Sequence, residues 1–136
     1  MNRSVESVNL AALFAALADS TRLRLLNLMA GREVCVCYFV EILRQGQPKI
    51  SRHLAYLRKA GLVAARREGK WMHYRIVPPK DSASAAILET VLASLGRDRR
   101  MQWERARLDR ACCARQNAVV LERAPRPALL TESGKS

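Results

Sequence analysis

The sequence predicts a mainly helical domain with one small β-hairpin, in the order helix, helix, helix, helix, strand, strand, helix, with a further helix at the end. Apolar residues recur at helical spacing along most of the chain, the period changes to two between residues 62 and 77, and Gly or Pro stands near the breaks. We expect one domain over residues 5–115, because 136 residues is the length of a single domain. Residues 116–136 contain two prolines and no clear period, which predicts a flexible C-terminal tail.

The first two helices are separated by Asp19 and Ser20, which are residues that cap helix starts. Residues 5–18 predict a helix with one apolar face, formed by Leu10, Leu13, Phe14 and Leu17. Residues 20–29 predict the second helix, which ends before Gly31. Its spacing places Leu23, Leu26, Leu28 and Met29 inward, and Arg22, Arg24 and Asn27 outward.

A third helix is predicted over residues 35–44, and residues 45–47 form a short turn after it. Pro48 then stands in the first turn of a fourth helix, where its missing N–H is tolerated. This helix continues to Ala60 and has an apolar face of Ile50, Leu54 and Leu57.

The period of two predicts strands over residues 62–67 and 70–77, joined at Glu68 and Gly69. A helix over residues 82–95 follows, and a more polar helix over residues 97–114 ends on a pair of cysteines.

Positive charge is concentrated in the middle of the chain. The net charge is +12, and residues 42–77 carry nine basic groups against Glu68 alone. Such a concentration is typical of a surface that binds phosphate, although a solvated basic surface would have the same composition.

The order of elements around this charge predicts a winged helix-turn-helix, in which the second helix of the motif enters the major groove of duplex DNA. Its N-terminal residues would contact bases, and the hairpin would act as a wing along phosphates. The candidate DNA-binding residues are Gln47, Lys49, Ser51, Arg52, His53, Tyr56 and Lys59 on the helix, and Arg66, Arg67, Lys70 and Arg75 on the hairpin.

Four cysteines form two close pairs, Cys35 with Cys37 and Cys112 with Cys113. Thiolate clusters bind soft metals or metalloids, or respond to oxidants. Buried cysteines can also be plain packing residues. Residues at i and i+2 of a helix point apart, so Cys35 and Cys37 converge only if their segment is extended or lies at a loose helix start. We expect Arg32 and a helix N-terminus to lower their pKa values.

Three segments resemble the ArsR/SmtB family of winged-helix metalloregulators: residues 15–26 (AALADSTRLRLL), residues 51–63 (SRHLAYLRKAGLV) and the wing end at residues 73–76 (HYRI). The resemblance spans about residues 10–95 and is most specific in the middle segment. It implies a homodimeric repressor that binds operator DNA and is released by an inducer. The first and last helices would form the dimer, with Leu10, Leu13, Ile87, Leu88, Val91, Leu92 and Leu95 as candidate contacts.

Residues 33–37 resemble the thiolate motif of the arsenic-sensing members, which implies As(III) or Sb(III) as inducer and no permanent cofactor. The usual third cysteine is replaced by Val40, and the usual acidic residue by Tyr38. Our hypothesis is therefore a three-sulfur site of Cys35, Cys37 and one or both of Cys112 and Cys113, within one protomer or across the dimer.

Other functions remain open at this level. The cysteines of the same fold could act as a thiol redox or persulfide switch. A thiol enzyme or metalloid carrier is less favoured, because nucleophilic catalysis needs an orienting base and no His is close to either pair in sequence. His53 and His73 lie in the DNA-binding unit and lack the spacing of zinc ligands. No apolar run is long enough to span a membrane and no secretory signal is evident, so we expect a cytoplasmic location. We expect no enzymatic activity, because neither cysteine pair has an orienting base nearby in sequence.

Overall fold

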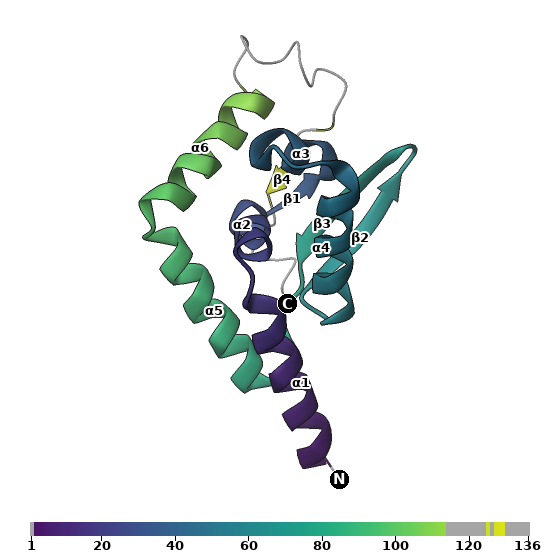
Figure 1. The fold of residues 1–136 in the computed structure, drawn as a ribbon, viewed down its shortest axis with the longest axis vertical. Coiled ribbons are helices and arrows are strands. Elements are labelled where there is room, and N and C mark those ends of the chain that lie inside the picture. Colours follow the sequence, from purple (N-terminus) through teal and green to yellow (C-terminus); the bar gives the residue numbers. More distant parts are fainter. Residues whose placement is uncertain (1, 114–124, 126, 130–136) are drawn as a thin grey trace.

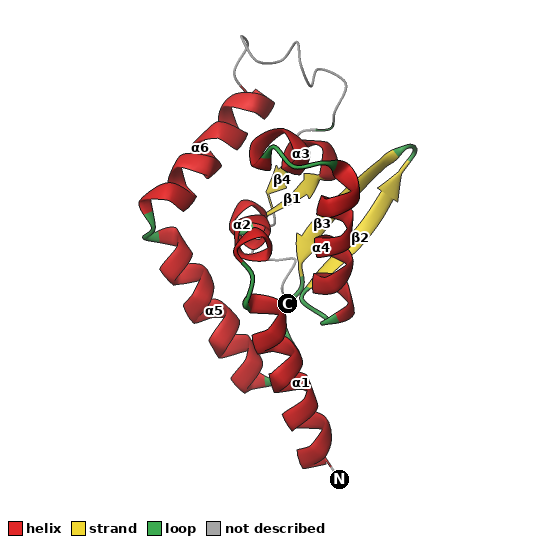
Figure 2. Ribbon diagram, viewed as in Figure 1, coloured by secondary structure: helices red, strands yellow, loops and turns green. Residues whose placement is uncertain are grey.

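The computed structural model describes residues 2–113, 125 and 127–129 (Figure 1). Most of these residues are helical, and a small antiparallel sheet completes the fold (Figure 2). This confirms the predicted winged helix-turn-helix architecture. The elements are α1 Asn2–Leu17, α2 Ser20–Met29, β1 Arg32–Cys35, α3 Val36–Leu43, α4 Gln47–Lys59, β2 Val63–Glu68, β3 Trp71–Ile76, α5 Ser82–Gly96, α6 Arg99–Cys113 and β4 Ala128–Leu129.

The helix α2 lies at the centre of the fold, with α5 and α6 on one side and α4 with the hairpin on the other (Figure 1). Asp19 caps its start, because its Oδ1 accepts the backbone N–H of Arg22 at 3.0 Å. The side chains of Leu25, Leu26, Leu28 and Met29 are all fully buried. These residues join α4 and α6 into one hydrophobic core, which includes Leu54 and Leu108.

The predicted outward position of Asn27 is wrong, because α6 covers that face of α2. Asn27 is 2% exposed, and its Nδ2 donates to the Met101 carbonyl at 2.9 Å. On the same face, the Arg24 guanidinium donates to the Glu104 carboxylate, with Nε 3.0 Å from Oε2. Both partners belong to α6, whose packing on α2 the sequence of α2 alone could not predict.

The sheet has the strand order β2-β3-β1-β4, and the hairpin pairs from Val63 opposite Ile76 to Glu68 opposite Trp71. The strands β1 and β4 were not predicted. The sequence assigned Cys35 to the start of a helix, but it ends β1 and lies opposite His73 of β3. All four residues of β1 are buried, so the strand shows none of the alternation that reveals a half-buried strand. Ala128 and Leu129 pair with β1 in a segment where the sequence predicted no strand; the remainder of 116–136, apart from residues 125 and 127, lies outside the described residues.

Within the described residues, no helix combines the length and the apolar character needed to cross a membrane.

Candidate nucleic-acid interface and thiol pair

The helices α3 and α4 form the helix-turn-helix. Arg44 ends α3 in the left-handed conformation, with φ 56° and ψ 43°, and the chain reverses into α4 within the next two residues. Pro48 lies in the first turn of α4, as predicted. The side chains of Ile50, Leu54 and Leu57 are fully buried and hold one face of α4 against the core. The opposite face of α4 is thereby turned toward solvent.

Six of the seven predicted DNA-binding residues of α4 are exposed: Gln47, Lys49, Ser51, Arg52, Tyr56 and Lys59. His53 differs, since its side chain is only 17% exposed and its Nδ1 lies 3.8 Å from Asp19 Oδ1 and 3.4 Å from Arg22 Nη1. Burial lowers the pKa of His53, and the positive charge of Arg22 acts in the same direction. The structure therefore brings His53 into contact with α2.

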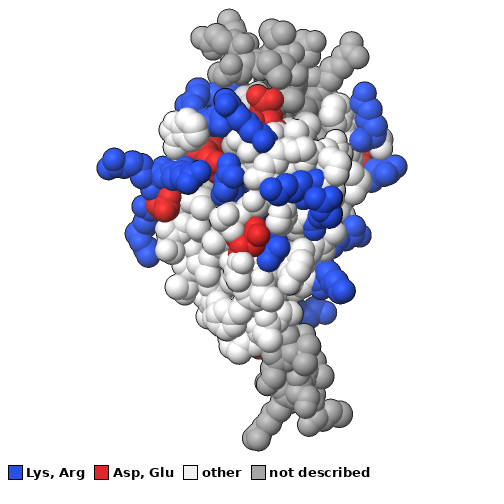
Figure 3. Space-filling view, viewed as in Figure 1, with Lys and Arg blue, Asp and Glu red and all other residues white. Residues whose placement is uncertain are grey.

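The hairpin of β2 and β3 projects beside α4 as a wing (Figure 1). Arg67 and Lys70 are exposed near its tip, and Lys70 Nζ lies 5.2 Å above the Trp71 ring. Arg75 is half-buried. Arg66 is tied to β1, because its Nη2 donates to Glu33 Oε1 at 2.7 Å, and this guanidinium lowers the pKa of Glu33. In Figure 3, lysines and arginines gather over the upper half of the visible face and along the wing side.

The thiols of Cys35 and Cys37 converge, with 3.4 Å between their Sγ atoms. They meet because Cys35 still has the extended backbone of a strand, with φ −73° and ψ 143°, and Cys37 lies in the first turn of α3. This is the extended or loose helix start that convergence requires. Cys35 is fully buried and Cys37 is half-buried, so only Cys37 is accessible from solvent.

The two thiols titrate as a pair. The Cys37 thiol donates to the Cys35 sulfur and lowers the pKa of Cys35 to about 6, helped by the backbone N–H groups of Cys37 and Val36 and by the nearby His73. The same interaction raises the pKa of Cys37. The N–H groups of the helix start thus lower the pKa of Cys35 as predicted, but the predicted lowering at Cys37 is wrong, because its hydrogen bond to Cys35 and its burial raise its pKa. Arg32 does not contribute as predicted, because its Nη1 donates to Asp109 of α6 at 2.9 Å.

His73 lies across the sheet from Cys35 and is 3% exposed. Its Nε2 is 2.9 Å from Glu68 Oε1 at the end of β2. The absence of a nearby His in sequence was one ground for disfavouring a thiol enzyme, and the strand pairing overturns that ground. Cys35 is fully buried, so a molecule from solvent reaches the pair from the side of the half-buried Cys37.

Cys112 is buried in α6, 7% exposed, and belongs to the same hydrophobic cluster as Cys35. Its Sγ lies 3.6 Å from the Asp109 carbonyl oxygen. The side chain of Cys113 lies outside the part of the chain that the structure describes. Among the described residues of one protomer, no three potential metal ligands gather at one point. The pair of Cys35 and Cys37 is thus the part of the predicted thiol site that the structure brings together.

The candidate dimer residues fall into two groups. Leu13, Leu88 and Leu95 are buried within the protomer, whereas Leu10, Ile87, Val91 and Leu92 are half-buried on α1 and α5. The neighbouring Phe14 of α1 is 53% exposed, and Glu89 is the only charged residue of α5. These two helices therefore present an apolar surface that is incompletely covered in a single protomer.

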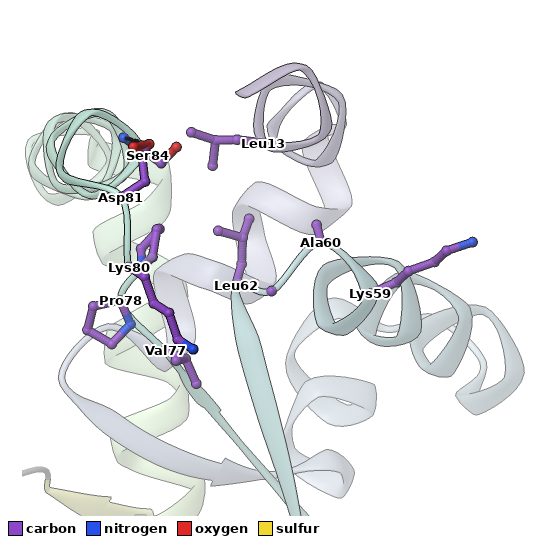
Figure 4. Close-up of a pocket in the computed structure, with 11 residues that line it drawn as sticks. Leu13, Lys59, Ala60, Leu62, Val77, Pro78, Lys80, Asp81 and Ser84 are labelled. Carbon is purple, nitrogen blue, oxygen red and sulfur yellow. Dashed lines mark hydrogen bonds between the residues drawn. The ribbon is translucent and has the colours of Figure 1, made fainter. Parts of the chain in front are cut away.

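A pocket of about 410 Å³ lies between α1, the end of α4 and the connection from β3 to α5 (Figure 4). Leu13 and Ser84 point toward one another across it, and Lys80 lies along its wall. None of the cysteines lines this pocket. The thiol pair is consequently separate from it.

These features define a winged-helix DNA-binding protein with a vicinal thiol pair before its helix-turn-helix. The family model "Bacterial regulatory protein, arsR family" matches residues 19–65. The arsenical resistance operon repressor of Escherichia coli is 49% identical over 78 residues, which are 57% of this chain and 67% of that protein. The chain belongs to the ArsR family and is a transcriptional regulator.

Solved structures agree with this assignment. Reduced HlyU from Vibrio cholerae superimposes with a TM-score of 0.58 at 27% identity, covering 68% of this chain and 95% of that one. The AntR antimony-specific transcriptional repressor gives a TM-score of 0.54 at 33% identity, covering 68% of this chain and 82% of that one. The fold is thus that of winged-helix regulators.

Proposed function

We propose that this chain is a homodimeric repressor that leaves its operator when trivalent arsenic or antimony binds Cys35 and Cys37. The observation that carries the proposal is the 3.4 Å separation of the two Sγ atoms at the start of α3. Similar proteins are named as arsenical resistance and antimony-specific repressors, which supports this class of inducer.

The DNA-binding part of the proposal rests on α4 and the wing. The exposed face of α4 carries Lys49 and Arg52 near its start, where a recognition helix contacts bases and phosphates. Arg67 and Lys70 at the wing would add phosphate contacts that strengthen binding without reading sequence. A two-fold dimer through α1 and α5 would present two such helices to half-sites about one helical turn apart.

The thiol geometry suits a pyramidal ion. If the zinc–sulfur length of about 2.3 Å serves as a guide, a separation of 3.4 Å corresponds to a sulfur–ion–sulfur angle of about 95°. This angle is narrower than a tetrahedral angle. It matches the pyramid of trivalent arsenic, in which the lone pair narrows the angles between the bonds. A third sulfur would come from Cys112 or Cys113 of α6, in the same protomer or across the dimer.

The reaction by which arsenous acid would bind the two sulfurs needs no oxidant. Arsenous acid, As(OH)₃, would form two As–S bonds with one thiolate and one thiol, releasing one water and one hydroxide. The existing pair supplies both forms at neutral pH, because the pKa of Cys35 is lowered to about 6 and that of Cys37 is raised.

The route from ligand to DNA is short. The helix α3 has eight residues, begins at the thiol pair and ends at the turn into α4. Arg107 of α6 donates to the Ile42 carbonyl at 3.1 Å, close to that turn. A ligand that draws α6 and the start of α3 together would therefore shift α4. Ligand and operator would then weaken each other's binding by the same factor. The corresponding coupling free energy is typically about 1–3 kcal/mol.

The test is operator release by arsenite, antimonite, zinc and peroxide, compared in mobility-shift assays on the upstream promoter. Cys35→Ser and Cys37→Ser should each abolish release by arsenite while leaving operator affinity unchanged. The double variant Cys112→Ser/Cys113→Ser should weaken release. Unchanged release in this double variant would show that the composite site is wrong, and unchanged release in Cys35→Ser would overturn the proposal.

A thiol redox switch is a second candidate, favoured by the same thiolate and thiol in contact. Peroxide would oxidise Cys37, the sulfur accessible from solvent, to a sulfenic acid and release water. The Cys35 thiolate would then attack that sulfur and form a disulfide with loss of hydroxide, so that two electrons pass to the peroxide. This function predicts release by peroxide that dithiothreitol reverses, with no need for arsenite.

A further inference from the structure

The side chain of Arg22 links the end of α1 to α4. On one side, its Nε donates to the Ala16 carbonyl at 2.8 Å and its Nη2 donates to the Ala15 carbonyl at 2.9 Å. Carbonyl groups in the last turn of a helix lack the partner that a further turn would supply, and a cation placed there is favourable. The Ala15 carbonyl also accepts the backbone N–H of Ala18 at 3.3 Å. Arg22 thus fixes the carboxyl end of α1 from outside the helix.

On its other side, the same guanidinium lies against α4. Its Cζ is 4.0 Å from the centroid of the Tyr56 ring, and its Nη1 is 3.4 Å from His53 Nδ1. Both residues belong to the outer part of α4, and the Arg22 side chain is only 11% exposed. A guanidinium stacked on an aromatic ring and shielded from water forms a favourable cation–π contact.

The shape of the guanidinium is essential to this arrangement. Two N–H groups of Arg22 donate to two successive carbonyls of α1, while the flat face of the guanidinium covers the Tyr56 ring. The ammonium group of a lysine cannot make both contacts. The two contacts therefore tie α4 to the end of α1 through a single side chain.

We infer that Arg22 is a positioning residue that sets the placement of the DNA-reading helix relative to α1, and with it the half-site spacing that the protein accepts. The inference rests on the proposed dimer through α1 and α5. In such a dimer, α1 would be fixed at the two-fold axis, and the Arg22 contacts would set how far each α4 lies from that axis.

Arg24 offers a matched control on the same helix. It is also an arginine that links α2 to another element, since its guanidinium donates to Glu104 of α6. Within the described part of the chain, the hydrogen bonds of the Arg24 guanidinium run to α6 and not to α4. A change at Arg24 therefore removes a partly buried arginine contact but keeps the link between α1 and α4.

The experiment compares Arg22→Lys, Arg24→Lys and the unaltered protein on two duplexes. The first carries the two half-sites selected from a random duplex pool by the unaltered protein, and the second carries one additional base pair between them. Affinities are measured by fluorescence anisotropy, and folding by thermal denaturation. If Arg22→Lys does not fold, Tyr56→Leu replaces it, because Tyr56 is 45% exposed and the change removes the other side of the stack.

Arg22→Lys should bind the selected duplex about five- to thirtyfold more weakly and should discriminate less between the two spacings. Tyr56→Leu should behave alike, and combining the two changes should add little further loss. Arg24→Lys should keep the discrimination of the unaltered protein even if it melts at a lower temperature. Unchanged discrimination in Arg22→Lys, or in Tyr56→Leu where it replaces it, would overturn the inference. Failure of the unaltered protein to bind the selected duplex as a dimer would instead overturn the proposed function.

Discussion

Replacement of Cys37 by Ala should abolish the acidic titration of Cys35. The Cys37 thiol lies 3.4 Å from Cys35 Sγ and is the main cause of the lowered pKa of Cys35, which is about 6. Without that donor, burial of Cys35 acts against its charged form, and its pKa should rise to the ordinary thiol value of about 8.5 or above. The pKa of Cys35 should therefore rise by at least about two and a half pH units.

The size of this change can be expressed as thiolate content. At pH 7, a pKa of about 6 leaves about ten thiolates for each thiol at Cys35, so the site is mostly charged. A pKa of about 8.5 leaves only about 3% thiolate at the same pH. Cys37→Ala should therefore need a pH well above neutrality to bind a thiophilic ligand through Cys35.

The assay is the ultraviolet absorbance of thiolate followed against pH, in a Cys112→Ser/Cys113→Ser background so that the pair is observed alone. Cys37→Ser is the matched control, because its hydroxyl can still donate and should keep the pKa of Cys35 well below the ordinary value. If Cys37→Ala still titrates near pH 6, the contact between the two sulfurs is not what stabilises the thiolate, and the electrostatic reasoning fails.

Three further changes test the fold and the DNA interface. Leu54→Ala should lower the free energy of unfolding by about 2–5 kcal/mol in urea denaturation, because the side chain is fully buried; a loss below that of an exposed change such as Lys59→Ala would contradict the packing of α4. Asp81→Ala should lower it by about 1 kcal/mol, since Asp81 Oδ2 accepts the Ser84 N–H at 2.9 Å at the start of α5, and Asp81→Asn should retain most of this. Lys49→Ala should weaken binding to all duplex sequences and reduce the slope of log affinity against log salt by about one; an unchanged slope in anisotropy titrations would exclude a phosphate contact.

The helices were predictable because their signals are local. The apolar spacing of Ile50, Leu54 and Leu57 gave the buried face of α4, and Asp19 marked the start of α2. Exposure of the basic residues opposite that face then followed from helical geometry alone. Local patterns of this kind survive in the folded chain because one face of each helix must be buried.

Contacts between distant segments were not predictable in the same way. The strand β1 is too short and too completely buried to show a period, so its pairing of Cys35 with His73 was hidden. The ion pair of Glu33 with Arg66 joins residues far apart in sequence, and it engages an arginine that was predicted to contact DNA. Such pairs depend on the register between strands, which the local pattern of a single sequence does not reveal.

The thiol site was predicted in part. The spacing of Cys35 and Cys37 indicated that they converge only at a break between an extended segment and a helix, and the structure has that break. The predicted effect of Arg32 on the thiol pKa values was wrong, because the Arg32 guanidinium donates to Asp109 of α6 instead. Completion of the site by Cys112 or Cys113 stays a prediction.

The central claim is that inducer and operator bind in a mutually weakening way through α3. Its most direct test is the affinity of the protein for arsenite, measured by titration calorimetry with and without saturating operator duplex. We predict that the duplex weakens arsenite binding by the same factor by which arsenite weakens duplex binding, as linkage requires. Equal arsenite affinity in the presence and absence of the duplex would contradict the claim, even if arsenite binds Cys35 and Cys37.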